Sequence, residues 1–377
     1  MANDSNARFS EFDRQMMLRA LECAKRGTGN VSPNPLVGCV LTNSSGEIIG
    51  EGAYLQFGGL HAEPNAIRDA ESRAYSVQGA TVYVTLEPHS FRGKTPPCST
   101  LLVEKKVARC VIATPDPNPQ VSGKGIEELR AAGIAVELGL LEEESKDLNR
   151  FFFKHIVTQQ PYVTLKLAMS LDGRTALQNG ESKWITSEAS RAKVHALRAE
   201  HDAVLIGTKT ALKDNPALTV RHVRGRQPWR IVLDTRLELP SSLTVLNDEE
   251  RARTILVTSA NAIADRGKPF AERGVELLAV ATSNGRIDLP ALFNTLGRRG
   301  IISILAEAGP ILAQSLIGSQ LLDELQLFYG PLLFGSDAQA AIGPLKLNSL
   351  AQAPHLKLLN LERVEGTDDV LLRFQQL

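Results

Sequence analysis

Four side chains in the N-terminal half have the types and positions that zinc-dependent hydrolysis requires. His61 and Glu63 belong to a His-Ala-Glu triplet at the start of a helical stretch, His89 follows the apolar run TVYVTLE, and Cys98 follows Thr-Pro-Pro at the start of another helical stretch. Zinc binds histidine nitrogen and cysteine thiolate, and catalytic sites use three protein ligands and leave a fourth position for water. Strand ends of an α/β sheet gather such ligands. We predict that His61, His89 and Cys98 bind one Zn²⁺ per chain.

Glu63 is the candidate acid–base residue. Bound zinc lowers the pKa of its water to about 7, and a carboxylate beside the metal must carry the proton to the leaving nitrogen. The pattern is similar to the His-x-Glu and Pro-Cys-x-x-Cys signature of zinc deaminases, although here the tail is longer and histidine replaces the first cysteine. We also expect the helix N-terminus at Cys98 to lower the pKa of that thiol and so to favour the thiolate.

Apolar strand-like runs alternate with helical segments in both halves of the chain. In the first half the runs are VGCVLT, TVYVTL, ARCVIAT and IAVELG; in the second they include YVTLKLAMS, AVLIGT, WRIVLDT, TILVTS, ISILAEA and ELQLFYG. Such alternation indicates an α/β fold with a largely parallel sheet. A charged helical stretch and then Pro161 separate the two series. We therefore predict two α/β domains, residues 1–148 and 149–377.

Composition narrows the class of protein. The chain has 377 residues, with 42 Lys and Arg balancing 42 Asp and Glu, which argues against a nucleic-acid or membrane-surface binder. Four cysteines are too few for a disulfide framework. We expect no signal peptide, because the first thirty residues include four acidic ones, Asp4, Glu11, Asp13 and Glu22, and lack the apolar core of such a peptide. No apolar run approaches the ~20 residues of a membrane helix. A soluble, cytoplasmic protein is expected.

Longer motifs carry a resemblance to a known family. SPNPLVGCVL, HAEPNAI, TLEPHSFRGKTPPC and ATPDPNPQVSGKGIEELRAAGI resemble the deaminase half of the bacterial bifunctional riboflavin-biosynthesis deaminase/reductase, and KLAMSLDGRTA, GESKWITS, KDNPALTVR and AEAGPILAQSL resemble its reductase half. The resemblance spans nearly the whole chain in the family's order. It implies a cytidine-deaminase-like domain followed by a dihydrofolate-reductase-like domain, a zinc ion, NADPH, a pyrimidine ribotide substrate and a homo-oligomer, either dimer or tetramer.

The resemblance also implies site residues. In the first half these are the ligands at 61, 89 and 98, the proton shuttle Glu63, and the ribotide contacts Asn34, Lys94, Asp116 and Asn118. Lys94 suits that role because a ribose phosphate needs a cation. The implied NADPH contacts are Ala168, Trp184, Thr210, Asp214, Thr235, Gly309, Pro310, Ile311, Leu312, Ala313, Gln314 and Ser315. The implied substrate contacts of the reductase are Ser182, Arg198, Leu218, Arg221 and Glu307.

Two further features support a phosphate-binding second half. The Gly309-Pro310 turn opens an apolar helix, whose free N–H groups favour an anion. Two arginines among the implied substrate contacts suit a phosphorylated sugar. The implied reaction is deamination of 2,5-diamino-6-ribosylamino-4(3H)-pyrimidinone 5′-phosphate, followed by hydride transfer to C1′ of the opened ribosylamine. Lys166, Asp172, Asp214 and water are the candidate proton donors.

The chain departs from the family in one stretch. The usual EPCSHxG reads EPHSFRG here, so that His89 replaces a cysteine ligand and Phe91 replaces a histidine. Imidazole is a good zinc ligand, and we therefore expect an active zinc site with ligation through Nδ1 of His89. Three alternatives remain at this stage: a reductase with an impaired deaminase, a nucleic-acid deaminase with an accessory domain, and a metabolite-binding protein with a structural zinc.

Overall fold

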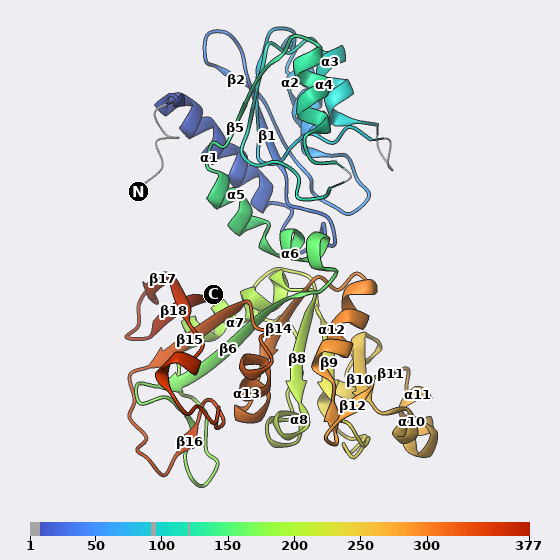
Figure 1. Ribbon diagram of the computed structural model, residues 1–377, viewed down its shortest axis with the longest axis vertical. Helices are drawn as coiled ribbons and strands as arrows, with labels where there is room; N and C mark the ends of the chain where they lie inside the picture. The colour runs from blue at the N-terminus through green and yellow to red at the C-terminus, as the bar shows by residue number, and fades with distance from the viewer. Residues whose placement is uncertain (1–7, 92–95, 120) are drawn as a thin grey trace. The chain divides into compact units, whose positions relative to one another are not determined.

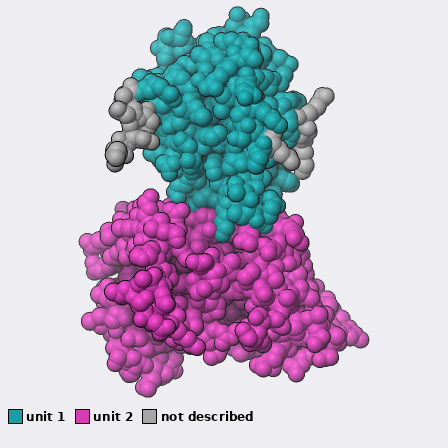
Figure 2. Space-filling view, in the orientation of Figure 1, with its two compact units in different colours: residues 1–159 teal, residues 160–377 magenta. Residues whose placement is uncertain are grey.

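The computed structural model describes residues 8–91, 96–119 and 121–377. The chain divides into two compact units, residues 1–159 and 160–377 (Figure 2). Helix α6 (Arg150–Thr158), which follows the expected boundary at residue 148, belongs to the first unit. Among the helices of the described residues, none combines the length and the apolar character that a membrane crossing requires.

The first unit contains a five-stranded sheet in the order β2-β1-β3-β4-β5 (Figure 1). Its strands are β1 (Gly38–Thr42), β2 (Ile48–Ala53), β3 (Thr81–Val84), β4 (Arg109–Ile112) and β5 (Ala135–Leu138). Strands β3, β4 and β5 are parallel, whereas β1 is antiparallel to both β2 and β3. We predicted a largely parallel sheet, but only two of the four strand pairings in this sheet are parallel. Strand β2 was not predicted; a short turn joins it to β1, and such a turn can connect only antiparallel strands.

The first unit also contains helices, two of which begin at predicted zinc ligands. The helices are α1 (Glu11–Lys25), α2 (Ala62–Ser72), α3 (Cys98–Glu104), α4 (Lys124–Ala131), α5 (Glu142–Leu148) and α6. Helix α2 packs closely on β2, where Gly50 and Gly52 leave no room for a Cβ beside the helix backbone. This close approach fixes the position of the α2 N-terminus relative to the sheet.

The second unit is built on a nine-stranded sheet in the order β11-β10-β9-β8-β14-β6-β15-β18-β17. Its strands are β6 (Tyr162–Ser170), β8 (Ala203–Gly207), β9 (Trp229–Leu233), β10 (Thr254–Thr258), β11 (Glu276–Ala279), β14 (Ser303–Glu307), β15 (Glu324–Gly330), β17 (Leu356–Arg363) and β18 (Val370–Gln376). All neighbours are parallel except at β18, which is antiparallel to β15 and β17. The carboxyl ends of β6, β14, β8, β9 and β10 therefore meet at one edge, where parallel sheets bind ligands.

The remaining elements of the second unit are shorter. Two small sheets pair β7 (Arg174–Ala176) with β16 (Gln339–Ala340) and β12 (Thr282–Ser283) with β13 (Arg286–Ile287). The α-helices are α7 (Glu188–Glu200), α8 (Thr208–Asp214), α9 (Thr244–Asn247), α10 (Ala260–Arg266), α11 (Lys268–Ala271), α12 (Leu289–Arg298) and α13 (Pro310–Gly318). Two 3₁₀ turns are η2 (Arg251–Arg253) and η3 (Leu350–Gln352).

Candidate functional site

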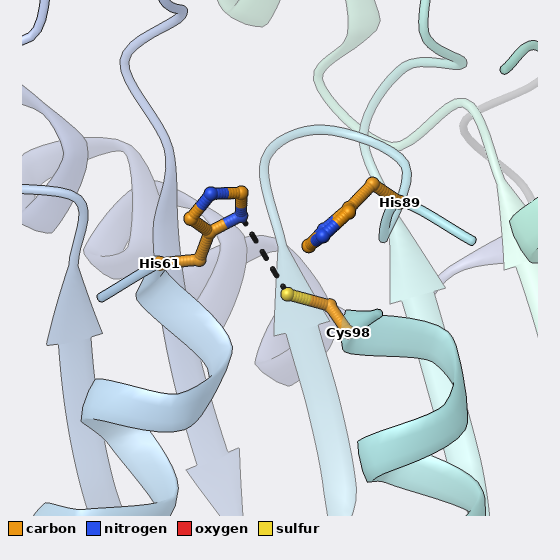
Figure 3. Close-up of side chains that lie close together, drawn as sticks. All are labelled: His61, His89 and Cys98. Atoms are coloured by element: carbon orange, nitrogen blue, oxygen red, sulfur yellow. Dashed lines mark hydrogen bonds between the residues drawn. The ribbon is translucent and has the colours of Figure 1, made fainter. Parts of the chain in front are cut away.

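Three predicted ligands from separate parts of the chain lie together in the first unit (Figure 3). His61 is the N-cap of α2, His89 lies in the loop after β3, and Cys98 is the first residue of α3. Nδ1 of His61 lies 3.7 Å from Sγ of Cys98, and the imidazole centroids of the two histidines are 4.5 Å apart. One ligand atom from each of the three residues lies within 4.8 Å of the others.

This donor set fits zinc. Zinc–nitrogen and zinc–sulfur bonds of about 2.0–2.3 Å in tetrahedral geometry place neighbouring ligand atoms about 3.5 Å apart. The distance of 3.7 Å between His61 and Cys98 agrees with that separation. Three side chains of the described residues make up the set, which is the ligand number of a catalytic site rather than a structural one. His89 therefore lies close enough to His61 and Cys98 to be the predicted third ligand.

Glu63 lies beside the ligands, in the first turn of α2. Its carboxyl is buried, and its Oε2 has no hydrogen-bond partner among the described residues. Burial raises the pKa of this carboxyl, although a backbone hydrogen bond and one from Cys98 act in the opposite direction. A buried carboxyl with a raised pKa and an unused oxygen can both accept and return a proton.

One expectation about Cys98 is wrong. We expected the helix N-terminus to lower the pKa of its thiol, but burial, and then the Glu63 carboxylate, raise that pKa well above its ordinary value. The opposing effect of α3 is small, because this helix has only seven residues and the effect of a helix dipole is modest. Metal binding at Cys98 must therefore displace a proton.

Of the other predicted contacts of the first unit, Asn34 is linked to this cluster through Tyr54. Asn34 donates a hydrogen bond from Nδ2 to the hydroxyl of Tyr54 at 3.0 Å, and the Tyr54 ring packs edge-on against His61. Asp116 accepts a hydrogen bond from the backbone N–H of Asn118 at 2.8 Å, and burial raises the pKa of Asp116 to about 6. Lys94 lies outside the described residues.

Two residues that sequence reasoning did not select hold these contacts in place. Tyr54 is buried between Asn34 and His61. The buried Glu87 carboxylate accepts hydrogen bonds from four backbone N–H groups, those of Asp116, Gly123, Gly125 and Ile126. The Glu-Pro before His89 was the only local signal for Glu87, and its partners lie about thirty to forty residues further along the chain. Glu87 thereby fastens the loop that carries Asp116 and Asn118.

A large cavity opens at the carboxyl edge of the second sheet, with a volume of about 1610 Å³. It is lined by sixteen of the residues that we expected to contact NADPH or the substrate or to donate a proton: Lys166, Ala168, Ser182, Trp184, Arg198, Thr210, Asp214, Leu218, Arg221, Thr235, Glu307, Gly309, Pro310, Ile311, Leu312 and Ser315. Gly309 approaches Thr210 closely, since a Cβ at this glycine would lie 3.4 Å from Oγ1 of Thr210. The structure thus brings residues from β6 and from the carboxyl ends of β8, β9 and β14 into one site.

Three predicted residues do not line this cavity. Ala313 is buried in the hydrophobic core, because it lies on the face of α13 that packs against the sheet. Gln314 is also absent from the cavity lining, and Gly343 packs against it. Asp172, a candidate proton donor, accepts hydrogen bonds from Ser170 and from the backbone N–H groups of Phe334 and Gly335. These bonds lower the pKa of Asp172 to about 2, so it is a poor acid.

A largely buried cluster of charges lies in the lining of the cavity. Arg198 binds Glu307 through two hydrogen bonds of 2.5 and 3.0 Å, and Lys166 is paired with Glu307 across β6 and β14. Burial alone would raise the pKa of Glu307, but the charges of Arg198 and Lys166 outweigh burial and lower that pKa to about 2. Burial lowers the pKa of Lys166; Glu307 opposes this shift and Arg198 adds to it. Lys166 therefore gives up a proton more readily than Arg198, where burial is outweighed by Glu307 and the pKa is raised.

Breaking the Arg198–Glu307 pair should destabilise the second unit. Arg198→Met leaves a buried carboxylate without its main partner, and we expect the free energy of unfolding to fall by about 3 kcal/mol at pH 7. Because folding lowers the pKa of Glu307 from 4.5 to about 2, this contribution is full above pH 4.5 and is lost as the pH falls toward 2. Urea denaturation measures the change.

The matched control is Arg253→Met, which breaks an exposed pair with Glu250 and should cost less than about 1 kcal/mol. Equal losses of stability in Arg198→Met and Arg253→Met would contradict the assignment of the Arg198–Glu307 pair as a buried, strongly coupled one.

Comparisons with known proteins cover both units. Residues 10–114 match the family model of the cytidine and deoxycytidylate deaminase zinc-binding region, and residues 161–369 match that of the RibD C-terminal domain. The riboflavin biosynthesis protein RibD of Actinobacillus pleuropneumoniae is 40% identical over 371 residues, which cover 98% of this chain and 97% of that protein. The RibD protein of Escherichia coli K12 is 42% identical over 368 residues, covering 93% and 96%.

Solved structures agree with these matches over nearly the full length. Acinetobacter baumannii RibD, form 1, is similar with a TM-score of 0.85 at 37% identity, covering 97% of this chain and 99% of that one. A Thermotoga maritima structure, described as a diaminohydroxyphosphoribosylaminopyrimidine deaminase/5-amino-6-(5-phosphoribosylamino)uracil reductase, has a TM-score of 0.86 at 38% identity, with the same coverage. The similarity therefore includes both units and their order along the chain.

Proposed function

Because the chain belongs to the RibD family of bifunctional riboflavin-biosynthesis enzymes, we propose which residues carry each of its two reactions. The enzyme is a deaminase and a reductase that acts on a pyrimidine ribotide. In our proposal residues 1–148 deaminate 2,5-diamino-6-ribosylamino-4(3H)-pyrimidinone 5′-phosphate. Residues 149–377 then reduce the ribosyl group of the deaminated product to a ribityl chain with NADPH. The observation that carries the first assignment is the His61, His89 and Cys98 cluster beside a buried carboxyl.

In the first reaction Glu63 moves the protons. His61, His89 and Cys98 would hold zinc, which when bound supplies the Lewis acidity that makes water nucleophilic at neutral pH. Glu63 accepts a proton from that water and returns it to the departing amino nitrogen, which leaves as ammonia. Its raised pKa suits both steps. Nothing in the second half is needed for this reaction, so deamination should proceed without NADPH.

Three residues of the first unit are proposed to orient the pyrimidine ribotide. Asn34 is held by Tyr54 next to His61, and Asp116 and Asn118 share a loop that Glu87 fastens. Amide and carboxyl groups can read the donor and acceptor pattern of a pyrimidine edge. Lys94 is proposed to bind the ribose phosphate, on the basis of sequence resemblance alone.

In the second reaction the cavity holds the ribotide beside the cofactor. NADPH, when bound, supplies the hydride for C1′ of the opened ribosylamine. Of the candidate proton donors, Lys166 lies in the cavity beside Glu307 and has a lowered pKa. We assign Nζ of Lys166 as the donor of the proton that accompanies the hydride, with Glu307 and Arg198 fixing its surroundings.

Arg221 provides a selective test of the reductase site. Its side chain lines the cavity and is exposed, so Arg221→Ala should not disturb folding. Loss of one charge-assisted contact to the substrate phosphate should raise the reductase KM by about 10- to 100-fold. Ammonia release should not change. Steady-state kinetics of both reactions, with Arg253→Ala as an exposed control, test this; an unchanged reductase KM removes Arg221 from the substrate site.

The enzyme is proposed to be a cytoplasmic homo-oligomer. Strand β17 lies at the edge of the nine-stranded sheet, and Leu356, Leu358 and Leu361 on it are exposed. An exposed apolar edge strand is a surface that another sheet edge can cover. Sedimentation of the wild-type chain and of Leu358→Lys/Leu361→Lys tests the proposal: the wild type should be larger than a monomer, and the double variant should dissociate.

A further inference from the structure

The cavity of the second unit is lined by an arginine, Arg236, to which the proposed reaction assigns no role. Strands β9, β8, β14 and β6 are neighbours in this order in the sheet (Figure 1), so their carboxyl ends lie in a row. Neighbouring strands lie about 4.8 Å apart, so the ends of β14 and β9 are about 10 Å from each other. Glu307, the last residue of β14, lines the same cavity as Thr235 and Arg236, which follow β9.

This order fixes the direction in which a dinucleotide lies, given the proposed NADPH-dependent reduction. The hydride-donating ring must be next to the substrate, at the Lys166 and Glu307 end of the row. The diphosphate suits the N-terminus of α13, which begins just after β14. The adenosine must then extend away from β6, toward β8 and β9. Its ribose would come to the turn after β9.

That turn presents Arg236 on a fixed backbone. Asp234 is buried, and its carboxylate accepts a hydrogen bond from the backbone N–H of Leu239 at 2.9 Å. The carbonyl of Thr235 accepts hydrogen bonds from Thr258 and Ser259 at the end of β10. The guanidinium of Arg236 remains largely exposed, with a side-chain exposure of 76%, and forms an ion pair with Glu238 at 3.0 Å. Hydrogen bonds from Leu239 and from the end of β10 therefore hold this turn in place, and Arg236 on it lines the cavity.

We propose that Arg236 binds the 2′-phosphate of the adenosine and thereby selects NADPH over NADH. A phosphate dianion at the ribose 2′ position needs a cation, and arginine supplies parallel N–H donors to its oxygens. Glu238 carries the opposite charge, but an exposed ion pair is weak, so the phosphate can replace it. Arg286 is a second exposed arginine in the cavity lining; it follows the outermost strand, β11, and lies further along the row.

The test compares the two cofactors in matched variants. For Arg236→Gln, kcat/KM with NADPH in the reductase reaction should fall by about 10- to 100-fold, while kcat/KM with NADH should stay within about twofold of wild type. Affinity for 2′,5′-ADP, measured by calorimetry, should fall by the same factor, and affinity for 5′-AMP should not change. Arg253→Gln, which alters an exposed arginine–glutamate pair outside the cavity, should behave as wild type.

The outcomes separate this inference from the proposed function on which it rests. A wild type that uses NADPH and NADH equally well would contradict the NADPH assignment itself. A wild type that prefers NADPH, together with an Arg236→Gln variant that keeps the same preference and the same affinity for 2′,5′-ADP, would overturn only the role of Arg236. Loss of the preference in Arg286→Gln and not in Arg236→Gln would likewise overturn it.

Discussion

Glu63→Gln should abolish ammonia release and leave zinc binding intact. The amide has nearly the same shape as the carboxyl but cannot accept and return a proton, and removal of a general acid–base group costs about 10²- to 10⁴-fold in rate. Glu63 lies beside the ligands rather than among them, so the metal content should not change. Reduction of a pre-deaminated substrate takes place in the second unit and should continue at the wild-type rate. Ammonia release, bound zinc and NADPH oxidation are measured on the same preparation.

Glu71→Gln is the matched control for this variant. Glu71 lies in the last turn of the same helix, α2, where it is exposed and pairs with Lys105. Its substitution should leave both reactions unchanged. If deamination by Glu63→Gln stays within a few-fold of wild type, Glu63 does not shuttle the proton.

Substitutions at His89 should show whether this residue binds zinc. His89→Ala removes one of three protein ligands and should lower zinc affinity by more than about 100-fold, since even the loss of an outer-shell partner costs 10- to 100-fold. His89→Cys should retain zinc, because thiolate is an equally suitable ligand. Chelator competition measures both affinities. His355→Ala, at an exposed histidine of the second unit, is the control.

The cysteine variant has a second readout. A thiolate in place of neutral imidazole adds one negative charge beside the metal, which disfavours ionisation of water there. The acid limb of the deaminase pH–rate profile should therefore move to higher pH in His89→Cys. An unmoved limb, with the same zinc affinity in His89→Ala as in wild type, would mean that His89 does not bind the metal.

The metal cluster could be predicted from sequence because each ligand has a local signature. His61 and Cys98 begin helices and His89 follows a strand, so the predicted elements allow the three side chains to converge. The pKa of Cys98 could not be predicted in the same way. It depends on burial and on Glu63, and both are consequences of packing between distant segments.

Contacts between distant segments explain the other omissions. The role of Glu87 could not be predicted because the four backbone N–H groups that it binds lie on another segment of the chain. The role of Tyr54 could not be predicted because only folding places it between Asn34 and His61. In the second unit, resemblance identified most of the residues that line the cavity. The resemblance also implied that Ala313 contacts NADPH, but Ala313 lies on the face of α13 that packs in the hydrophobic core. Strand β17 was missed because its leucines are interrupted by polar residues and lie at an exposed edge.

We claim that His61, His89 and Cys98 form the metal centre of an active deaminase although a histidine stands at position 89. Zinc titration of metal-depleted enzyme tests this claim, with ammonia release from the diaminopyrimidine ribotide recorded in the absence of NADPH. Ammonia release should rise in proportion to added zinc and level off at one zinc per chain. Full-rate ammonia release by the metal-free protein would contradict the claim. So would no ammonia at full zinc loading while the same preparation still reduces the pre-deaminated substrate.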